Sequence, residues 1–390
     1  MSKSLTRVSA LLLAAASMSR ADSSACKLPA IPSVDLSSGF IEQANYECAP
    51  RTGTLKGLMI FVDFSDEPAT ETPTEMRDIF IPGTADWYEE VSYGKLDVNI
   101  TVDSSKFYRM PKTAADYDFE RGITYQQHLD YILDAFNLWQ KTATTPSPSG
   151  DEPLTDVLYI ITTANAKSIS TSATLSASVH DSNNNWIARR AVTLGPDDQS
   201  IWSLTLSHET GHCLCLPDMY PLAGGDPASW AGNWDLMATL QGPTQNFFAW
   251  NKWRLGWITD DQVECVTETG STTHKLTALE KTGGIKAVVI KQSETQALVA
   301  EARSKTGGDT ESCPPGVLLY TVATDKATGQ GPFHIVDANP GGSSSCGYNE
   351  FDDALLSVNG AKSATVDDFG VTVTVTEQQG DEYTIKVEKL

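Results

Sequence analysis

Basic residues are few in this chain of 390 residues. Lys and Arg together number 28 against 50 Asp and Glu, so the formal net charge is −22. A surface of this sign repels nucleic-acid phosphates and anionic lipid headgroups, which argues against nucleic-acid and membrane partners. The 40% hydrophobic content and the nine Trp residues nevertheless predict a folded chain with a buried core.

Long apolar runs are also lacking. At the N-terminus, Lys3 and Arg7 precede a short apolar stretch at 8–18, and the small residues Ser19 and Ala21 follow it. This pattern is typical of a secretory signal peptide, so we expect residues 1–21 to be removed by cleavage after Ala21. No later stretch approaches the roughly 20 apolar residues that cross a bilayer. We therefore expect a secreted, extracellular protein.

Seven cysteines lie beyond the signal peptide. In an oxidising compartment most of them should pair, and an odd count leaves at least one unpaired. Proximity in the chain predicts the pairs Cys26–Cys48 and Cys313–Cys346. Cys213, Cys215 and Cys265 then remain, with a bridge from Cys213 or Cys215 to Cys265 as one alternative.

The first part of the mature chain differs from the rest in composition and in hydrophobic periodicity. Residues 22–54 are rich in Ser and Pro and show little periodicity, which predicts a pro-segment or an N-terminal arm held by a disulfide. Residues 55–260 then alternate between strand and helix patterns. We expect strands at 58–62, 96–102 and 157–162, a helix that ends near 91 and a helix over 124–141. The aromatic stripe of this last helix, from Tyr125 to Trp139, predicts core packing.

Short β-type runs follow from about residue 261. Val371, Val373 and Val375 alternate with Thr, and residues 383–387 show the same period of two, so each strand should bury one face. We place a domain boundary near 260–264 and predict an antiparallel β-sandwich over 261–390. The fold class expected for the whole chain is α+β.

His208-Glu209-Thr210-Gly211-His212 is an H-E-x-x-H pattern. Residues four apart on a helix lie on one face, so both imidazoles can bind one Zn²⁺, while Glu209 is placed to act as general base. A helix ending near Leu214 is predicted independently of the motif. Apolar Ile201, Leu204 and Leu206, the acidic pair at 197–198 and the terminating Pro217 all favour it.

Catalytic zinc needs a third protein ligand and an open fourth position. No Glu occurs between Glu209 and Glu264, so Asp218, six residues beyond His212, is the favoured third ligand. Asp226 and Asp235 remain alternatives, and Cys213 or Cys215 would be a soft replacement. We expect the other histidines to be surface or packing residues: His128, His180, His274 and His334.

The segment 208–220 resembles the active-site segment of the immune inhibitor A family of secreted zinc metallopeptidases. Other blocks agree in order over about 55–258. Leu58–Asp66 resembles the first strand of that family and Trp87–Leu96 its helix-to-strand passage. Asn233–Met237 resembles the segment carrying its methionine turn, and Ala249–Trp257 resembles the helix that follows.

The resemblance implies a metzincin-like catalytic domain over 55–260. It implies that His208, His212 and Asp218 bind one catalytic Zn²⁺, that Glu209 is the general base and that Met237 lies beneath the metal. Peptide-bond hydrolysis in proteins or peptides follows as the expected reaction, with Tyr220 as a candidate further donor to the oxyanion.

Two features depart from the family pattern. Cys215 stands where the family has Gly, in a left-handed turn that costs other residues about 1–2 kcal/mol, and a disulfide would hold such a turn. Of the Asp-rich segment resembling a calcium site, only Asp151, Glu152 and Asp156 remain, so Ca²⁺ has no support in these residues. The alternative to a protease is a secreted zinc-containing binding or adhesion module without hydrolytic activity. In such a module, Glu209 would have no catalytic role.

Overall fold

The computed structural model describes residues 22–41, 48–143, 152–196, 199–242, 245–310, 315–342 and 349–390. Within these residues the chain is a mixed α/β protein with three sheets and five α-helices. The predicted signal peptide, the acidic pair at 197–198, Asp151 and the predicted Cys313–Cys346 pair lie outside the described residues. None of the described helices combines the length and the apolar character needed to cross a membrane.

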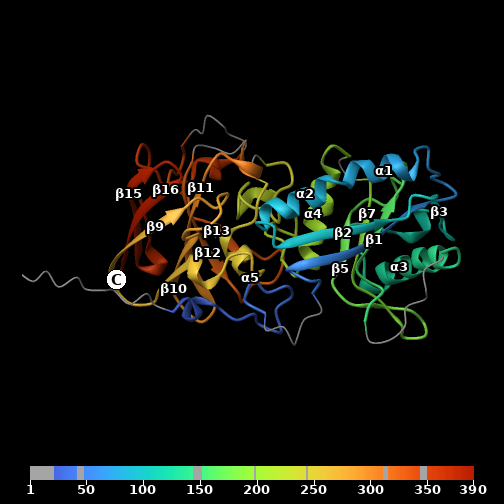
Figure 1. Cartoon of the computed structure of the whole chain (residues 1–390), viewed down its shortest axis with the longest axis horizontal. Coiled ribbons are helices and arrows are strands. Elements are labelled where there is room, and N and C mark those ends of the chain that lie inside the picture. The colour runs from blue at the N-terminus through green and yellow to red at the C-terminus, as the bar shows by residue number, and fades with distance from the viewer. Residues whose placement is uncertain are drawn as a thin grey trace, which may run out of the picture.

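A seven-stranded sheet forms the N-terminal half (Figure 1). Its order is β2-β1-β4-β7-β5, with β3 beside β1 and β6 beside β7. β5 and β6 run antiparallel to β7, and the other pairs are parallel. The strands are β1 Gly53–Asp63, β2 Leu96–Val102, β3 Tyr108–Arg109, β4 Thr155–Thr162, β5 Ala173–Leu175, β6 Val179–His180 and β7 Trp186–Leu194.

Helices cover both faces of this sheet. Helix α3 packs on one face with Leu58, Ile60 and Val62 of β1, and helices α1, α2 and α4 pack on the other with Met59 and Phe61. A strand between two helical layers is buried on both faces, which is why every residue of β4 is buried. The helices are α1 Pro73–Phe80, α2 Gly83–Val91, α3 Tyr125–Gln140, α4 Trp202–Cys213 and α5 Ala249–Arg254.

The strands and helices expected before residue 214 are confirmed. Thr124 caps α3 through a capping box with Gln127, which explains why the helix begins where its periodicity does. One part of the aromatic stripe was wrong, because Tyr125 is 53% exposed. The buried face of α3 is centred instead on His128, Tyr131, Ile132, Ala135, Phe136 and Trp139.

Two further sheets form the C-terminal half. Their orders are β13-β12-β11-β10-β8 and β14-β15-β16-β9, and apolar residues of both sheets share one cluster. Strands β8 and β10 are parallel, so the expectation of a wholly antiparallel arrangement was wrong at this edge. The strands are β8 Val263–Val266, β9 Gly270–Thr277, β10 Ala287–Lys291, β11 Gln296–Arg303, β12 Gly316–Ala323, β13 Phe333–Ile335, β14 Ser363–Val366, β15 Val371–Gln379 and β16 Glu382–Lys389.

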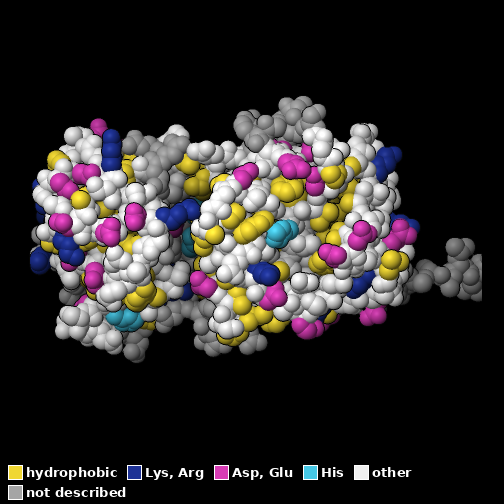
Figure 2. All heavy atoms as spheres, turned by 180° about the vertical axis from the view of Figure 1, so that it is seen from behind, with side chains coloured by type: hydrophobic (Ala, Val, Ile, Leu, Met, Phe, Trp, Pro, Cys, Tyr) yellow, Lys and Arg dark blue, Asp and Glu magenta, His cyan; other side chains and the backbone are white. Residues whose placement is uncertain are grey.

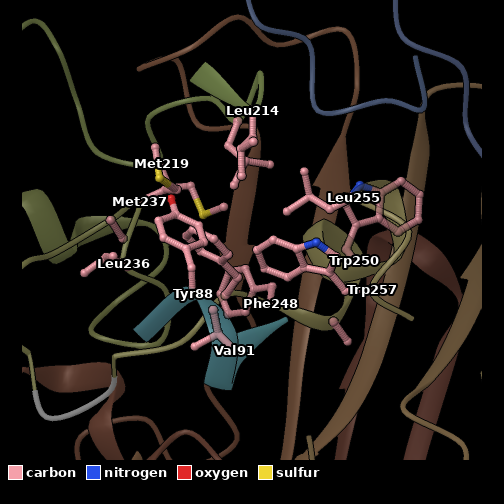
Figure 3. Close-up of a cluster of buried hydrophobic side chains, with 14 of the residues drawn as sticks. Tyr88, Val91, Leu214, Met219, Leu236, Met237, Phe248, Trp250, Leu255 and Trp257 are labelled. Carbon is pink, nitrogen blue, oxygen red and sulfur yellow. The ribbon is translucent and has the colours of Figure 1, made fainter. Parts of the chain in front are cut away.

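The two halves share a hydrophobic cluster. Figure 3 shows Tyr88 of α2 beside Met237, in one cluster with Val91 of the same helix and with Phe248 and Trp250. The same cluster includes the face of the five-stranded sheet that does not pack against the four-stranded sheet. Because its members come from both halves, the packing that fixes α4 also depends on the C-terminal sheet.

Figure 2 shows the face of the molecule opposite to that of Figure 1. Acidic side chains are spread over both halves of this face instead of gathered in one patch.

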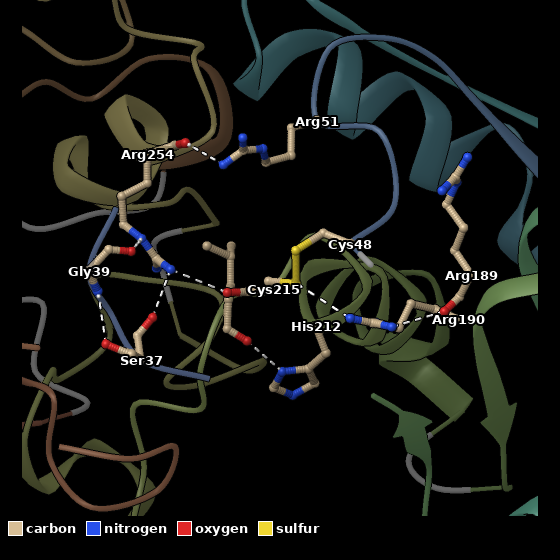
Figure 4. The surroundings of a disulfide bond; sticks show 10 residues. Ser37, Gly39, Cys48, Arg51, Arg189, Arg190, His212, Cys215 and Arg254 are labelled. Carbon is tan, nitrogen blue, oxygen red and sulfur yellow. Dashed lines mark hydrogen bonds between the residues drawn. A yellow bond between two sulfur atoms is a disulfide. The ribbon is translucent and has the colours of Figure 1, made fainter. Parts of the chain in front are cut away.

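The described part of the N-terminal arm crosses both halves. Trp250 Nε1 donates to the Ser38 carbonyl (2.8 Å), and the Arg254 guanidinium donates to the carbonyls of Ser37 (2.9 Å) and Gly39 (2.8 Å), as Figure 4 shows. The arm is therefore packed as part of the fold.

The disulfides are Cys26–Cys265 and Cys48–Cys215. The predicted pair Cys26–Cys48 was wrong because the arm does not fold back on itself: each end of it meets a different half. The bridge from Cys213 or Cys215 to Cys265 was wrong as well, since Cys213 is buried and unpaired. The bonds indicate an oxidising environment.

Candidate metal centre

Helix α4 places His208 and His212 on one face, one turn apart. Their ring centroids are 4.8 Å apart and the rings are perpendicular. His208 Nδ1 donates to the Leu236 carbonyl (2.9 Å) and His212 Nδ1 donates to the Leu216 carbonyl (2.8 Å). A carbonyl can only accept, so both rings carry their proton on Nδ1 and leave Nε2 free to bind a cation.

Asp218 completes the group. Its Oδ1 lies 3.2 Å from His208 Nε2 and 3.1 Å from His212 Nε2, and the Asp and both His residues are buried. Within the part of the chain that the structure describes, His208, His212 and Asp218 are the only group of at least three His, Cys, Asp or Glu side chains whose ligand atoms converge. These ligand atoms all lie within 4.8 Å of one another. The favoured third ligand therefore lies beside the two imidazoles, in the geometry that a metal site requires.

The distances from Asp218 to the two histidines are close to those expected around a tetrahedral ion. Two atoms bonded at 2.0–2.1 Å to such an ion lie about 3.3–3.4 Å apart, close to the observed 3.1–3.2 Å. Asp218 Oδ1 is a buried oxygen without a hydrogen-bond donor among the described residues. Two imidazole nitrogens and this one carboxylate oxygen form a group that could hold a metal ion.

The electrostatics of the group show how strongly it attracts positive charge. Although burial opposes the shift, the charge that His212 and His208 carry when Nε2 is also protonated, with the hydrogen bonds that Nε2–H then donates, holds the pKa of Asp218 well below its usual range. Burial would lower the pKa of His212, yet the charge of Asp218 and its hydrogen bond raise it to about 9. A proton on His212 therefore occupies the position that a cation would take.

Glu209 lies beside the His pair and opens onto a cleft. Thr174 Oγ1, on edge strand β5, donates to Glu209 Oε2 (2.6 Å). Two cavities of about 540 and 240 Å³ meet here, and Arg121, Glu209 and Tyr220 line both of them. His208 lines the larger cavity, whereas His212 and Asp218 line the smaller one. The centre is thus reached from two sides.

A loop supported by Asp235 forms the floor of the centre. Asp235 accepts the backbone N–H groups of Met237 (2.8 Å) and Phe248 (2.6 Å), which fixes the Leu236 carbonyl that orients His208. Burial raises the pKa of Asp235 to about 6. Met237 Sδ lies so close to Gly211 that a Cβ built there would be 2.6 Å away. Met237 therefore packs under the helical turn that carries both histidines.

The end of α4 orients His212. Cys215 has φ +66°, its N–H bonds to the His212 carbonyl (2.9 Å), and the Leu216 N–H bonds to the Gly211 carbonyl (3.1 Å). These are the two bonds of a Schellman motif, in which the left-handed residue is usually Gly. Here it is a cysteine held by its disulfide to Cys48, and the Leu216 carbonyl that follows accepts from His212.

The alternative ligands have other partners. Asp226 caps a short 3-10 helix through the Ala228 N–H, and Asp235 supports the floor loop. Cys215 is in a disulfide, and neither Cys213 nor Cys215 belongs to the converging group. Of the acidic residues considered for calcium, Glu152 and Asp156 both pair with Arg189.

The remaining histidines pack against aromatic or polar neighbours. His128 lies against Phe119 and Thr193, and burial lowers its pKa to about 4. His180 stacks on Trp186, His334 lies beside Trp230, and His274 pairs with Glu264. Sequence reasoning missed Thr174 and Arg121, because a lone Thr in a short edge strand and an Arg in a loop carry no pattern.

In comparisons with known proteins, no family model and no curated protein matches this chain.

Proposed function

We propose that the chain is a secreted zinc-dependent endopeptidase. One observation carries the proposal: Nε2 of His208, Nε2 of His212 and Oδ1 of Asp218 converge in a buried group, with Glu209 beside them on the wall of an open cleft. A structural zinc site closes its fourth position with a protein ligand, whereas a catalytic site leaves it open. The cleft at Glu209 favours the second kind.

His208, His212 and Asp218 would hold the ion. Zn²⁺ supplies a water of lowered pKa, near 7, and a Lewis acid for the scissile carbonyl. The Leu236 and Leu216 carbonyls keep both imidazoles in the tautomer that presents Nε2. Glu209 accepts a proton from the attacking water and delivers it to the leaving amine, while the Thr174 hydroxyl holds its carboxylate in place.

The finer fold assignments belong to the same proposal. Residues 55–260 would be a metzincin-like catalytic domain, which the packing of Met237 under α4 supports. Residues 261–390 would be a β-sandwich domain, which the apolar cluster shared by its two sheets supports. Secretion is supported by the two disulfides.

The test is Glu209→Gln in the full-length secreted chain. We expect hydrolysis of casein to fall at least about 100-fold, because general acid–base catalysis contributes 10²–10⁴-fold, while mass spectrometry finds one zinc per chain in both proteins. Glu377→Gln, at an exposed position of β15, is the matched control and should keep full activity. Undiminished hydrolysis by Glu209→Gln would remove Glu209 from the mechanism. A folded, zinc-loaded wild type that cleaves no protein would favour the binding module.

A further inference from the structure

Asp218 is held by a loop of the C-terminal half. Its N–H donates to Thr328 Oγ1 (2.8 Å) from 110 residues away, and its carbonyl accepts the Gly329 N–H (3.0 Å). The Thr328 hydroxyl also lies 3.4 Å from Asp218 Oδ2. Thr328 belongs to residues 324–332, which join β12 to β13 and which we name the β12–β13 loop. One hydroxyl thus contacts both the main chain and the carboxylate of a ligand residue.

The loop that carries Thr328 is itself held on two sides. The N-terminal arm fixes one side, because the Thr328 N–H bonds to the Asp35 carbonyl (3.0 Å) and Ser37 Oγ donates to the Thr324 carbonyl (2.6 Å). The segment after Asp218 fixes the other side. A Cβ at Gly329, where φ is +65°, would lie 2.2 Å from Leu222, so little space remains for this loop to shift.

The three ligand residues differ in how they are fixed. His208 and His212 lie within α4, and each ring is oriented by a carbonyl. Asp218 lies beyond the Schellman motif and outside any helix or strand, so its own segment does little to set its orientation. The contacts that fix its main chain come from Thr328 and Gly329.

We propose that Thr328 is a positioning residue for the metal ligand Asp218, and that the β12–β13 loop makes the C-terminal half a working part of the metal centre. The inference rests on the proposed zinc site. Partners of metal ligands typically change metal affinity about 10–100-fold when they are removed. The C-terminal half is then required for tight metal binding, beyond any role in substrate recognition.

Thr328→Val tests this in the full chain because it removes the hydroxyl and keeps the side-chain shape. We expect the Zn²⁺ dissociation constant, measured on metal-free protein by competition with a chromogenic chelator, to rise about 10–100-fold. Thr328→Ser should stay within about threefold of wild type, because it restores the hydroxyl. With Co²⁺ as probe, the visible absorption bands of Thr328→Val should shift or weaken, and those of Thr328→Ser should match wild type.

Thr324→Val is the matched control. It makes the same chemical change in the same loop, at a buried hydroxyl without a hydrogen-bond partner among the described residues, and should leave zinc affinity unchanged. Thr328→Ala carries the same expectation as Thr328→Val, so misfolding of one variant does not decide the question. Zinc affinity of folded Thr328→Val or Thr328→Ala within twofold of wild type would overturn the inference while leaving the peptidase intact. A wild type that binds no zinc overturns both proposals.

Discussion

At the scale of single residues, the candidate centre depends on hydrogen bonds whose direction is fixed by chemistry. A carbonyl oxygen can only accept, so the bonds to the Leu236 and Leu216 carbonyls determine which nitrogen of each imidazole carries the proton. Replacing either histidine would remove a proposed ligand. Moving either carbonyl would turn a ring away while leaving the residue in place.

Thr174 offers a test of how Glu209 is held. Its hydroxyl donates to Glu209 Oε2, and a hydrogen bond to a charged group contributes about 1.5–3 kcal/mol. If part of that energy orients the carboxylate in the transition state, Thr174→Val should lower kcat about tenfold. Zinc content and KM should change little, because Thr174 is not a member of the converging group of ligands.

Steady-state kinetics with a fluorogenic peptide would check this, beside mass spectrometry for zinc. Thr174→Ser, which keeps the hydroxyl, is the control and should retain most of the activity. A fall in zinc content with unchanged kcat per bound zinc would show that Thr174 supports the metal ligands instead of the base.

At the scale of elements, the sequence was most informative where one element determines the geometry. The H-E-x-x-H spacing brings His208 and His212 together on α4 without any help from the rest of the fold. The position of Asp218 follows less directly, because it depends on the chain reversal at Cys215 and on the β12–β13 loop. Neither Thr328 nor Gly329 carries a pattern that links it to a helix more than 100 residues earlier.

The left-handed residue at the end of α4 gives a second test. Cys48→Ala with Cys215→Ala removes the disulfide and leaves an alanine at φ +66°, whereas Cys48→Ala with Cys215→Gly removes the same bond and relieves the strain. Loss of a native disulfide costs about 2–5 kcal/mol. A left-handed conformation costs residues other than Gly a further 1–2 kcal/mol or so.

We therefore expect the glycine variant to be more stable than the alanine variant by about 1 kcal/mol, although Gly usually destabilises a chain through its entropy. Urea unfolding of both variants under identical conditions would measure the difference. Equal stabilities, or a more stable alanine variant, would show that the turn relaxes once the disulfide is gone.

At the scale of the whole molecule, the links between distant segments were beyond prediction from the sequence. Proximity predicted Cys26–Cys48, whereas these two cysteines join Cys265 and Cys215. A disulfide pairing follows from the tertiary path of the chain, and many pairings satisfy the same sequence. The path of the arm depends on Arg254 and Trp250, whose contacts with Ser37, Ser38 and Gly39 have no local signature.

A buried group of charges lies where α5 meets β11. Arg303 contacts Glu301 (2.6 Å), Asp309 (2.7 Å) and the Trp234 carbonyl (2.8 Å). Lys252 of α5 also belongs to the group, and burial, followed by the charge of Arg303, lowers its pKa to about 7. A buried charge is tolerated only when it is paired and hydrogen-bonded. This group therefore stabilises the junction between the two halves only while its positive and negative charges are paired.

Glu280 makes that balance depend on pH. Burial, its hydrogen bond to Asp309 and the charge of Asp309 raise the pKa of Glu280 from 4.5 to about 9. Two buried carboxylate oxygens, Glu280 Oε1 and Asp309 Oδ1, have no hydrogen-bond partner other than each other among the described residues, in keeping with a proton shared between them. The folded state thus binds this proton more tightly than the unfolded chain does.

The raised pKa of Glu280 determines how the stability of the fold changes with pH. The contribution of the bound proton is complete below about pH 4.5, the ordinary pKa of the side chain, and is lost as the pH rises to about 9. Glu280→Gln carries a hydrogen on its amide at every pH and still accepts the bonds that Ser304 donates to Glu280 Oε2. Relative to wild type, the variant should therefore gain stability as the pH rises.

Urea unfolding at pH 5.5, 7 and 8.5 would measure this gain. One pKa unit corresponds to about 1.4 kcal/mol, so we expect Glu280→Gln to be more stable than wild type by the order of 1–3 kcal/mol at pH 8.5, with a smaller difference at pH 5.5. The charge of Glu280 raises the pKa of Lys252, so the difference measures Glu280 together with its effect on Lys252. Glu377→Gln, at an exposed site, should change the free energy of unfolding little at any pH. A difference in the free energy of unfolding between Glu280→Gln and wild type that does not vary with pH would mean that Glu280 keeps no extra proton in the folded protein. The buried charges at the junction between the halves would then be paired without that proton.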